Sequence, residues 1–155
     1  MLTVLLGLAA QASSGSLSPA QPLPPPGQAE QAVLAPINAL LAALSAGDSA
    51  GVLRHVFPDG RVTATGTRSA SSGLRQESWA QFAGRVSPAT AFQETIIDPA
   101  IEIDGDVALV WASYVVRIGG KVANCGIDHF DLVRDNGVWK VMNLSFSSRV
   151  TDCPQ

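Results

Sequence analysis

One carboxylate near the end of the chain has the surroundings that acid–base chemistry needs. Asp128 lies in an alternating run that ends at Arg134, and a second such run follows the dipeptide Asn136-Gly137. A carboxyl group held against an indole and away from bulk water has a raised pKa, as a general acid or base working near neutral pH requires. We therefore predict that Asp128 is the catalytic or ligand-binding group of a pocket. The other predicted pocket residues are Trp111, Ser113, Phe130, Asn143 and Ser145.

Two short turns bring these side chains together. Asn-Gly readily supplies the two positive φ angles of a type I′ hairpin turn, and Gly119-Gly120 can form a second two-residue turn. The resulting pairs are Leu132–Val141, Phe130–Asn143, Asp128–Ser145, Trp111–Asp128 and Ser113–Gly126. A slip by one residue would move every side chain of a strand to the other face, so the apolar face that this pairing creates supports it.

Asp128 also has a purely structural interpretation. A buried carboxyl group needs hydrogen-bond partners whatever its role, so Asp128 could accept bonds from Asn143, Ser145 or a helix terminus and only fix the sheet. His55 is a weaker candidate for the pocket mouth, since a lone helical histidine is more often a surface or packing residue. His129 alternates to the face opposite Asp128, so these neighbours do not form a dyad.

Several classes of site have no signature in the sequence. Neither histidine has metal-ligand spacing to a second ligand and the two cysteines form no CxxC motif, so we expect no metal. The chain has no GxGxxG, Walker-type or GxSxG motif, and we expect no cofactor. A net charge of −3 with interspersed charges lacks the basic face that nucleic acids need.

The first half of the domain is predicted to be mainly helical. Apolar residues recur at helical spacing from Glu30 until Gly47, with Pro36 as a kink or a first-turn residue. Asp48 is predicted to cap a short helix that runs to about residue 56, and Ser78 a third helix within 77–86. Between them, 61–65 alternates like a short strand and 66–76 has the composition of a loop.

Long strands are predicted at 92–103, 107–118, 121–134 and after Gly137. An odd number of residues in the turn at Asp104-Gly105 would put the apolar residues on either side of it on one face, so we expect a three-residue loop. Pro99 should mark a bulge or an edge. This order of elements predicts an α+β domain in which three N-terminal helices pack on a curved, mostly antiparallel sheet.

Two runs carry a family resemblance, namely the helical Ala39–Asp48 with the short helix after it, and Gly126–Arg134 leading into Gly137–Val141. Over about residues 28–150 the chain resembles the nuclear transport factor 2-like superfamily, which includes ketosteroid isomerases, scytalone dehydratase and SnoaL-like polyketide cyclases. The resemblance implies a cone-shaped fold with one pocket. In the enolising and dehydrating enzymes of this superfamily a pocket carboxylate moves a proton, whereas other members bind ligands or dimerise, so the fold does not decide the activity.

The segment before the domain has the pattern of an export signal followed by a tether. Residues 2–10 are apolar and Ala10-Gln11-Ala12 has the small-x-small form of a signal-peptidase site, although a positively charged n-region is missing. About nine apolar residues are too few to span roughly 30 Å of hydrocarbon, so we expect a periplasmic or secreted protein without a stable membrane span. Residues 1–12 are the predicted signal, 13–27 a Pro-rich disordered tether, 28–150 the domain and 151–155 a tail.

The two cysteines form an even count in a chain that we expect to be exported. Cys125 lies opposite about Ser148 and Cys153 follows shortly after, so a disulfide that staples the tail to the sheet is the favoured prediction, and two unpaired thiols are the alternative.

Three functions fit these patterns. The first is an exported domain that binds a small apolar ligand, and the second is a cofactor-independent isomerase, dehydratase or cyclase in which Asp128 moves a proton. The third is a dimerisation module without a ligand. We expect a homodimer through the outer sheet face, where alternation predicts an exposed apolar patch of Val110, Ala112, Tyr114, Val116, Met142, Leu144 and Phe146.

Overall fold

The computed structural model describes residues 25–66 and 73–155. The predicted signal and most of the predicted tether lie outside these residues. The elements, in order, are α1 (Gln28–Ala46), α2 (Ser49–Arg54), β1 (Arg61–Gly66), β2 (Arg75–Ser78), α3 (Trp79–Ala83), the 3-10 helix η1 (Pro88–Thr90), β3 (Phe92–Asp104), β4 (Val107–Ile118), β5 (Lys121–Asp135) and β6 (Val138–Ser148).

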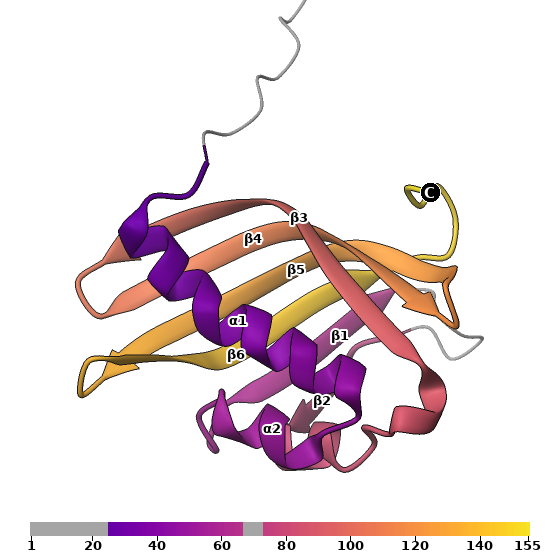
Figure 1. Ribbon diagram of the computed structural model, residues 1–155, viewed down its shortest axis with the longest axis horizontal. Coiled ribbons are helices and arrows are strands. Elements are labelled where there is room, and N and C mark those ends of the chain that lie inside the picture. Colours follow the sequence, from indigo (N-terminus) through magenta and orange to yellow (C-terminus); the bar gives the residue numbers. More distant parts are fainter. Residues whose placement is uncertain (1–24, 67–72) are drawn as a thin grey trace, which may run out of the picture.

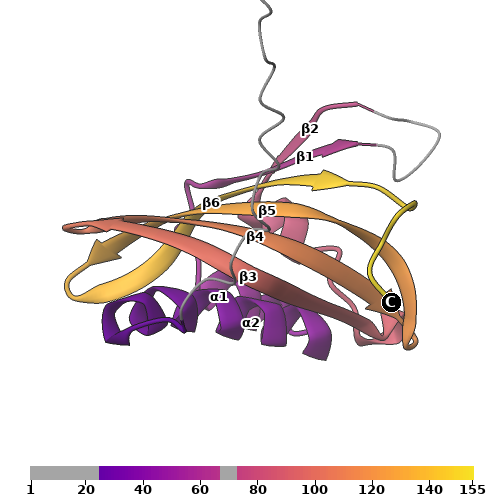
Figure 2. The ribbon, with the colours of Figure 1, turned by 90° about the horizontal axis from the view of Figure 1, so that it is seen from above.

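The strands form one curved sheet in the order β2-β1-β6-β5-β4-β3. Strand β1 pairs with β6 in parallel, and the other neighbours are antiparallel. The helices α1 and α2 lie on one side of this sheet, with α1 running across its concave face (Figure 1 and Figure 2). The predicted α+β fold, with helices packed on a mostly antiparallel sheet, is confirmed.

Helix boundaries follow the capping residues of the sequence. The backbone N–H of Gly27 donates to Glu30 Oε2 at 2.6 Å at the start of α1, and Gly47 ends the helix with a φ of 70°. Pro36 lies inside α1, so the helix begins well before it. Asp48 and Ser78 cap α2 and α3 as predicted. The third helix is shorter than expected because its predicted first residues belong to β2, which lies partly in the predicted loop.

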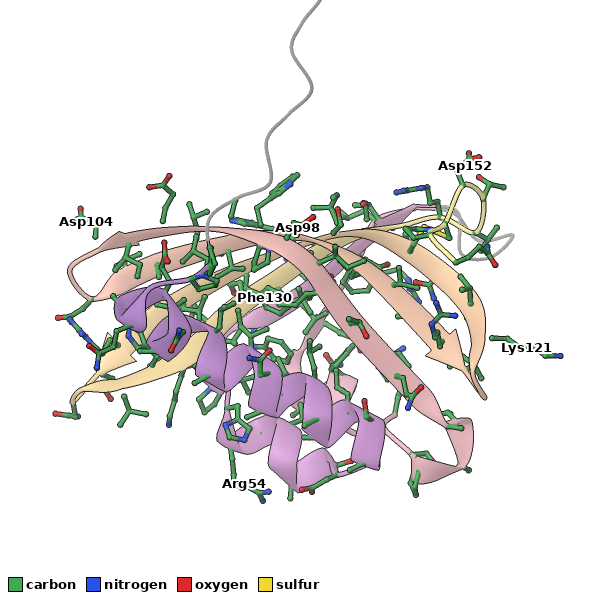
Figure 3. All side chains as sticks on the ribbon, turned by 45° about the horizontal axis from the view of Figure 1, so that its top comes forward. Arg54, Asp98, Asp104, Lys121, Phe130 and Asp152 are labelled. Atoms are coloured by element: carbon green, nitrogen blue, oxygen red, sulfur yellow. A yellow bond between two sulfur atoms is a disulfide. The ribbon has the colours of Figure 1, made fainter. Side chains whose placement is uncertain are left out.

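The concave face of the sheet and α1 share the main core. Val33, Ile37 and Leu40 of α1 are fully buried. They pack with Phe130, Leu132 and Val141 of β5 and β6, and Phe130 lies between α1 and the sheet in Figure 3. α1 is also long and apolar enough to span a membrane, a property that core helices and signal sequences share. Its buried apolar residues form a stripe that faces the sheet.

The turns match the prediction in two places out of three. Asn136 and Gly137 both have positive φ, at 50° and 80°, and Gly119-Gly120 forms the expected two-residue turn. The turn after β3 is different, because Asp104 pairs directly with Val107 and only two residues separate the strands. The predicted three-residue loop is therefore wrong. The bulge predicted at Pro99 is present, between Ile97 and Ala100.

Two further bulges make the predicted register wrong beyond the turns. Val116 pairs with Asn124 while Arg117 pairs with Val122, so one extra residue enters β5. Met142 is a second extra residue, in β6. It lies between Val141, which pairs with Leu132, and Asn143, which pairs with Asp131. Each bulge shifts the pairing by one residue, and a shift of one turns the following side chains to the other face. Asp128 consequently pairs with Ala112 and Phe146, where Trp111 and Ser145 were predicted.

Nearby groups hold the Met142 bulge in place. The indole Nε1 of Trp79 donates to the Met142 carbonyl at 2.9 Å. A Cβ at Gly60 would lie only 1.7 Å from the same carbonyl oxygen, so glycine is needed for this close approach. The bulge is therefore built into the packing of α3 and of the turn before β1.

The prediction of an exposed apolar patch on the outer face is also wrong, because the two bulges shift the register of these strands. Val110, Ala112, Tyr114, Val116 and Leu144 are buried, and they share the inner face with Asp128. The outer face instead exposes Ile97, Val107, Leu109 and Trp111.

The predicted disulfide joins Cys125 to Cys153, with Cα atoms 5.5 Å apart. Backbone hydrogen bonds between Cys125 and Arg149, at 2.9 and 3.0 Å, continue the pairing of β5 with the end of β6. The bond thus fastens the C-terminal tail to the sheet.

Candidate functional site

Asp128 lies on the inner face of the sheet, with 1% of its surface exposed. Its neighbours across the strands are Ala112 of β4 and Phe146 of β6. Its Oδ2 atom is buried and has no hydrogen-bond partner among the described residues. A buried polar atom without a partner costs about 1–3 kcal/mol, and such groups often mark a functional site.

Glu94 of β3 lies beside Asp128 and changes its chemistry. Burial raises the pKa of Asp128 well above its usual range, and the negative charge of Glu94 and a hydrogen bond between the two carboxyl groups raise it further. Two neighbouring carboxylates cannot both ionise at low cost, so the pair holds a proton to higher pH than an isolated aspartate does. A carboxyl group whose pKa is shifted in this direction is suited to act as a general acid or a hydrogen-bond donor.

Tyr114 and Asn124 complete the polar end of the site. The Tyr114 hydroxyl lies 2.9 Å from the Ser147 carbonyl and 3.1 Å from Asn124 Oδ1, so its single proton is shared between these two acceptors. Tyr114 faces Gly126 across the strands, and a Cβ on that glycine would lie 3.0 Å from the tyrosine ring and 2.0 Å from the Ser147 carbonyl oxygen. Gly126 therefore lets the ring lie close over β5.

These groups line a cavity beneath the helices. The inner cavity, of about 60 Å³, is lined by Leu44, Phe82, Phe92, Glu94, Tyr114, Val116, Asn124, Asp128, Leu144 and Phe146. A wider cleft of about 200 Å³ adjoins it, because both share Leu44, Phe82 and Phe92. Arg85, Val86, Ser87, Thr90 and Ile118 form the rest of this outer cleft. Together they give a mostly apolar passage that ends at the carboxyl groups of Asp128 and Glu94.

Four predicted pocket residues lie on the other side of the sheet from Asp128. On β4, Trp111 pairs with His129 and Ser113 pairs with Ile127. On β6, Asn143 pairs with Asp131 and Ser145 pairs with His129. These partners are the outward-facing residues of β5. The bulges at 123 and 142 account for this placement. Phe130 does share the inner face with Asp128, but it is fully buried in the core and does not line the cavity.

His55 lies at the C-terminal end of α2 and lines neither the inner cavity nor the outer cleft. Burial lowers its pKa, and the charge of Arg54 lowers it further. Arg54 points away from the sheet in Figure 3. The structure therefore does not bring His55 and Asp128 together.

The outer face has a shallow hollow of its own, of about 230 Å³, in which Trp111 and Ser145 meet Thr63, Thr65 and His129. Trp111 is 54% exposed and its ring centroid lies 6.0 Å from that of His129. Asn143 serves as a link, since its Oδ1 accepts from the Arg61 backbone at 2.9 Å and its Nδ2 donates to Asp131 at 3.3 Å.

Sequence reasoning missed Glu94 and Tyr114. A signal for Glu94 exists, because it alternates with Phe92 and Ile96 in β3, and an acidic residue on the apolar face of a strand needs an explanation. Tyr114 could be found only by knowing that an extra residue at 123 turns it inward. Among the residues that the structure describes, no group of three His, Cys, Asp or Glu is placed to hold a metal ion.

Solved structures similar to this chain have the same architecture at low identity. A nuclear transport factor 2-like protein from Cytophaga hutchinsonii is 16% identical with a TM-score of 0.65, and the match covers 79% of this chain and 99% of that one. A protein from Xanthomonas campestris, described as a "putative calcium/calmodulin dependent protein kinase II association domain", is 21% identical with a TM-score of 0.64, over 83% and 93%. A protein of unknown function from Mycobacterium tuberculosis is 17% identical with a TM-score of 0.62, over 78% and 72%.

At these identities the likeness concerns the fold. No curated protein matches the sequence. The family model described as "Putative lumazine-binding" matches residues 28–147, which is most of the chain. The chain therefore belongs to this lumazine-binding-like family, and its fold is that of the nuclear transport factor 2-like superfamily.

Proposed function

We propose that this protein is an exported domain that binds a small, largely apolar ligand between its helices and the inner face of its sheet. The observation that carries the proposal is the buried pair of Asp128 and Glu94 at the closed end of an apolar cleft, where Asp128 Oδ2 has no partner among the described residues. Pockets that combine apolar walls with a few convergent polar groups and a perturbed pKa are typical ligand sites. The family description supports ligand binding in general, and it does not identify the ligand.

Blocking the cleft tests this proposal. Val86 lines the outer cleft, so Val86→Trp should fill it, whereas Val138→Trp places the same side chain at an exposed hairpin turn. Apolar cyclic ligands should raise the melting temperature of the wild type and of Val138→Trp by mass action, and should leave that of Val86→Trp unchanged. An equal rise in all three proteins would place the site elsewhere.

Catalysis is the second candidate function, and the proximity of Asp128 to Glu94 favours it. A carboxyl group with a raised pKa can move a proton near neutral pH, as in a cofactor-independent isomerase, dehydratase or cyclase. Deuterium uptake from D₂O into cyclic ketones, followed by NMR, reports such proton transfer. Uptake should be abolished in Asp128→Asn and kept in Val138→Trp; unchanged uptake in Asp128→Asn would exclude Asp128 as the group that moves the proton.

Export is supported by the disulfide, since such bonds persist in oxidising compartments. Mass spectrometry of the protein recovered from the periplasm or medium should find an N-terminus just after Ala12. An intact Met1 on cytoplasmic protein would contradict this.

For the quaternary structure, the proposal is that two copies of the chain associate through the outer sheet face. Ile97, Val107, Leu109 and Trp111 are exposed there, and isologous pairing is the commonest way to bury such a face. Light scattering should give a two-chain mass that Trp111→Lys halves. Leu53→Lys, at an exposed position of α2, is the control that should leave the mass unchanged.

A further inference from the structure

The charges around the inner cavity are of one sign. Asp128 and Glu94 supply two carboxyl groups, and none of the described residues that line this cavity is a lysine, arginine or histidine. Arg85 lines the outer cleft, but it pairs with Glu77 and lies over the Phe82 ring. α1 contributes only Leu44, and β6 only Leu144 and Phe146. The closed end of the passage therefore favours positive charge.

Aromatic side chains surround this acidic pair. Phe82, Phe92, Tyr114 and Phe146 all line the inner cavity. Tyr114 and Phe146 meet edge to face, with ring centroids 6.3 Å apart. Aromatic faces attract cations within about 6 Å, and the attraction is largest where water is excluded. Carboxylates and aromatic rings together form the usual surroundings of a bound organic cation.

The unpartnered Oδ2 of Asp128 requires a donor. Among the described residues no group donates to this buried oxygen, which can accept a hydrogen bond. An ammonium group has three donors and no acceptor, so it can satisfy Oδ2 and the neighbouring carboxylate at once. A hydroxyl can give one hydrogen bond, and a carboxylate would be repelled.

We infer that the polar head group bound at the inner cavity is a protonated amine, carried on an apolar body that occupies the outer cleft. This inference rests on the proposed function and specifies its ligand class. The cavity volume of about 60 Å³ suits one small head group, since a single water needs roughly 10–15 Å³ of such space. The cleft of about 200 Å³ suits one ring.

Binding of such a cation has a measurable consequence for protons. The ammonium group stabilises the doubly ionised state of Asp128 and Glu94, so the proton held between them is released to the solvent. No covalent bond forms, and the net charge of the ligand does not change. A neutral alcohol of the same shape leaves the shared proton in place. The other polar groups that line the cavity are the Tyr114 hydroxyl and the Asn124 amide.

Three ligands with one carbon skeleton test the inference: cyclohexylmethylamine, cyclohexylmethanol and cyclohexanecarboxylate. Calorimetric titration of the full chain at pH 7, in phosphate and in Tris, gives affinity and proton release together. We expect the amine to bind about tenfold more tightly than the alcohol and to release protons. The alcohol should bind without proton release, and the carboxylate should show no binding.

Variants assign the preference to the carboxyl pair. Glu94→Gln and Asp128→Asn should reduce the difference between amine and alcohol to about twofold while the alcohol still binds, which also shows that the cleft is folded. Glu102→Gln is the control, because Glu102 lies on the outer face of the same strand.

Equal affinity for amine and alcohol in the wild type, or an unchanged preference in Glu94→Gln, would overturn the inference and leave the proposed function standing. Failure of all three ligands to bind would overturn both.

Discussion

The inner and outer faces of the sheet carry polar groups in opposite situations. On the inner face Asp128 is buried, has an unpartnered oxygen and lies against a second carboxyl group. On the outer face Asp131 contacts His129 at 3.5 Å and accepts from Asn143, and water reaches all three. Polar groups that satisfy one another in solvent are explained by the fold, whereas a buried carboxyl oxygen without a partner among the described residues calls for a ligand.

Bulges decide which residues belong to which face. Without the extra residues at 123 and 142, Trp111 and Ser145 would be the neighbours of Asp128, and the exposed indole would be buried against it. With them, the inner face receives Tyr114 and Phe146. The chemistry of the cavity therefore depends on two single-residue insertions, one near the start of β5 and one within β6.

The largest contrast should appear when one large side chain is removed from each face. Phe130→Ala should lower the free energy of unfolding by about 3–5 kcal/mol, since Phe130 is fully buried and its loss leaves a cavity. Trp111→Ala should cost less than about 1 kcal/mol in the single chain, because the indole is exposed. Denaturant unfolding measures both values.

Equal losses would mean that the faces are assigned wrongly. A cost of Trp111→Ala that grows with protein concentration would instead measure the proposed association through the outer face.

The disulfide is where the outer face should contribute most to stability. Reduction, or the pair Cys125→Ser and Cys153→Ser, opens a loop with a sequence separation of 28 residues and should cost about 3–4 kcal/mol by loop entropy. Thermal unfolding with and without reductant checks this. The serine pair should be insensitive to reductant; a wild type equally insensitive would show that the bond does not form in solution.

Most of the fold could be predicted from local signals. The caps at Asp48 and Ser78, the Gly47 stop and the Asn136-Gly137 turn each rest on a backbone requirement that few residues meet, and each is present. Alternation in the long strands located them within one or two residues. The disulfide followed from two cysteines that strand pairing brings close.

Side-chain orientation could not be predicted in the same way. A bulge costs little and leaves the strand composition unchanged, so periodicity does not reveal it. What fixes the bulge at Met142 is tertiary, namely the Trp79 indole and the space left by Gly60. Asp128 was identified because its own run keeps its phase, whereas the pocket residues on β4 and on the far half of β6 were placed on the wrong face.

A pH-dependent stability difference should distinguish the buried carboxyl group from the outer ones. The raised folded pKa of Asp128 means that its favourable contribution is complete below its unfolded value of about 3.8 and is lost as pH rises through the folded pKa. Asp128→Asn should therefore become more stable than the wild type with rising pH, by about 1.4 kcal/mol for each pH unit between the two pKa values.

Chemical unfolding at pH 4 and pH 8 measures this difference. Asp131→Asn on the outer face is the matched control, since Asp131 is partly exposed and accepts a hydrogen bond from Asn143. A wild type that gains stability over Asp128→Asn between pH 4 and pH 8 would contradict the assignment.

The smallest expected effect tests the two faces directly, through coupling between pairs of residues. Asn143→Ala should cost about 1 kcal/mol, because the backbone N–H of Arg61 loses its acceptor. Combined with Asp128→Asn, this cost should add within about 0.3–0.5 kcal/mol, since the two side chains lie on opposite faces. Glu94→Gln combined with Asp128→Asn should instead deviate from additivity by more than about 0.5 kcal/mol, because the two carboxyl groups share a hydrogen bond. Asp128 could instead couple more strongly to Asn143 than to Glu94. That result would contradict the Met142 bulge and would favour the pocket that alternation alone predicts.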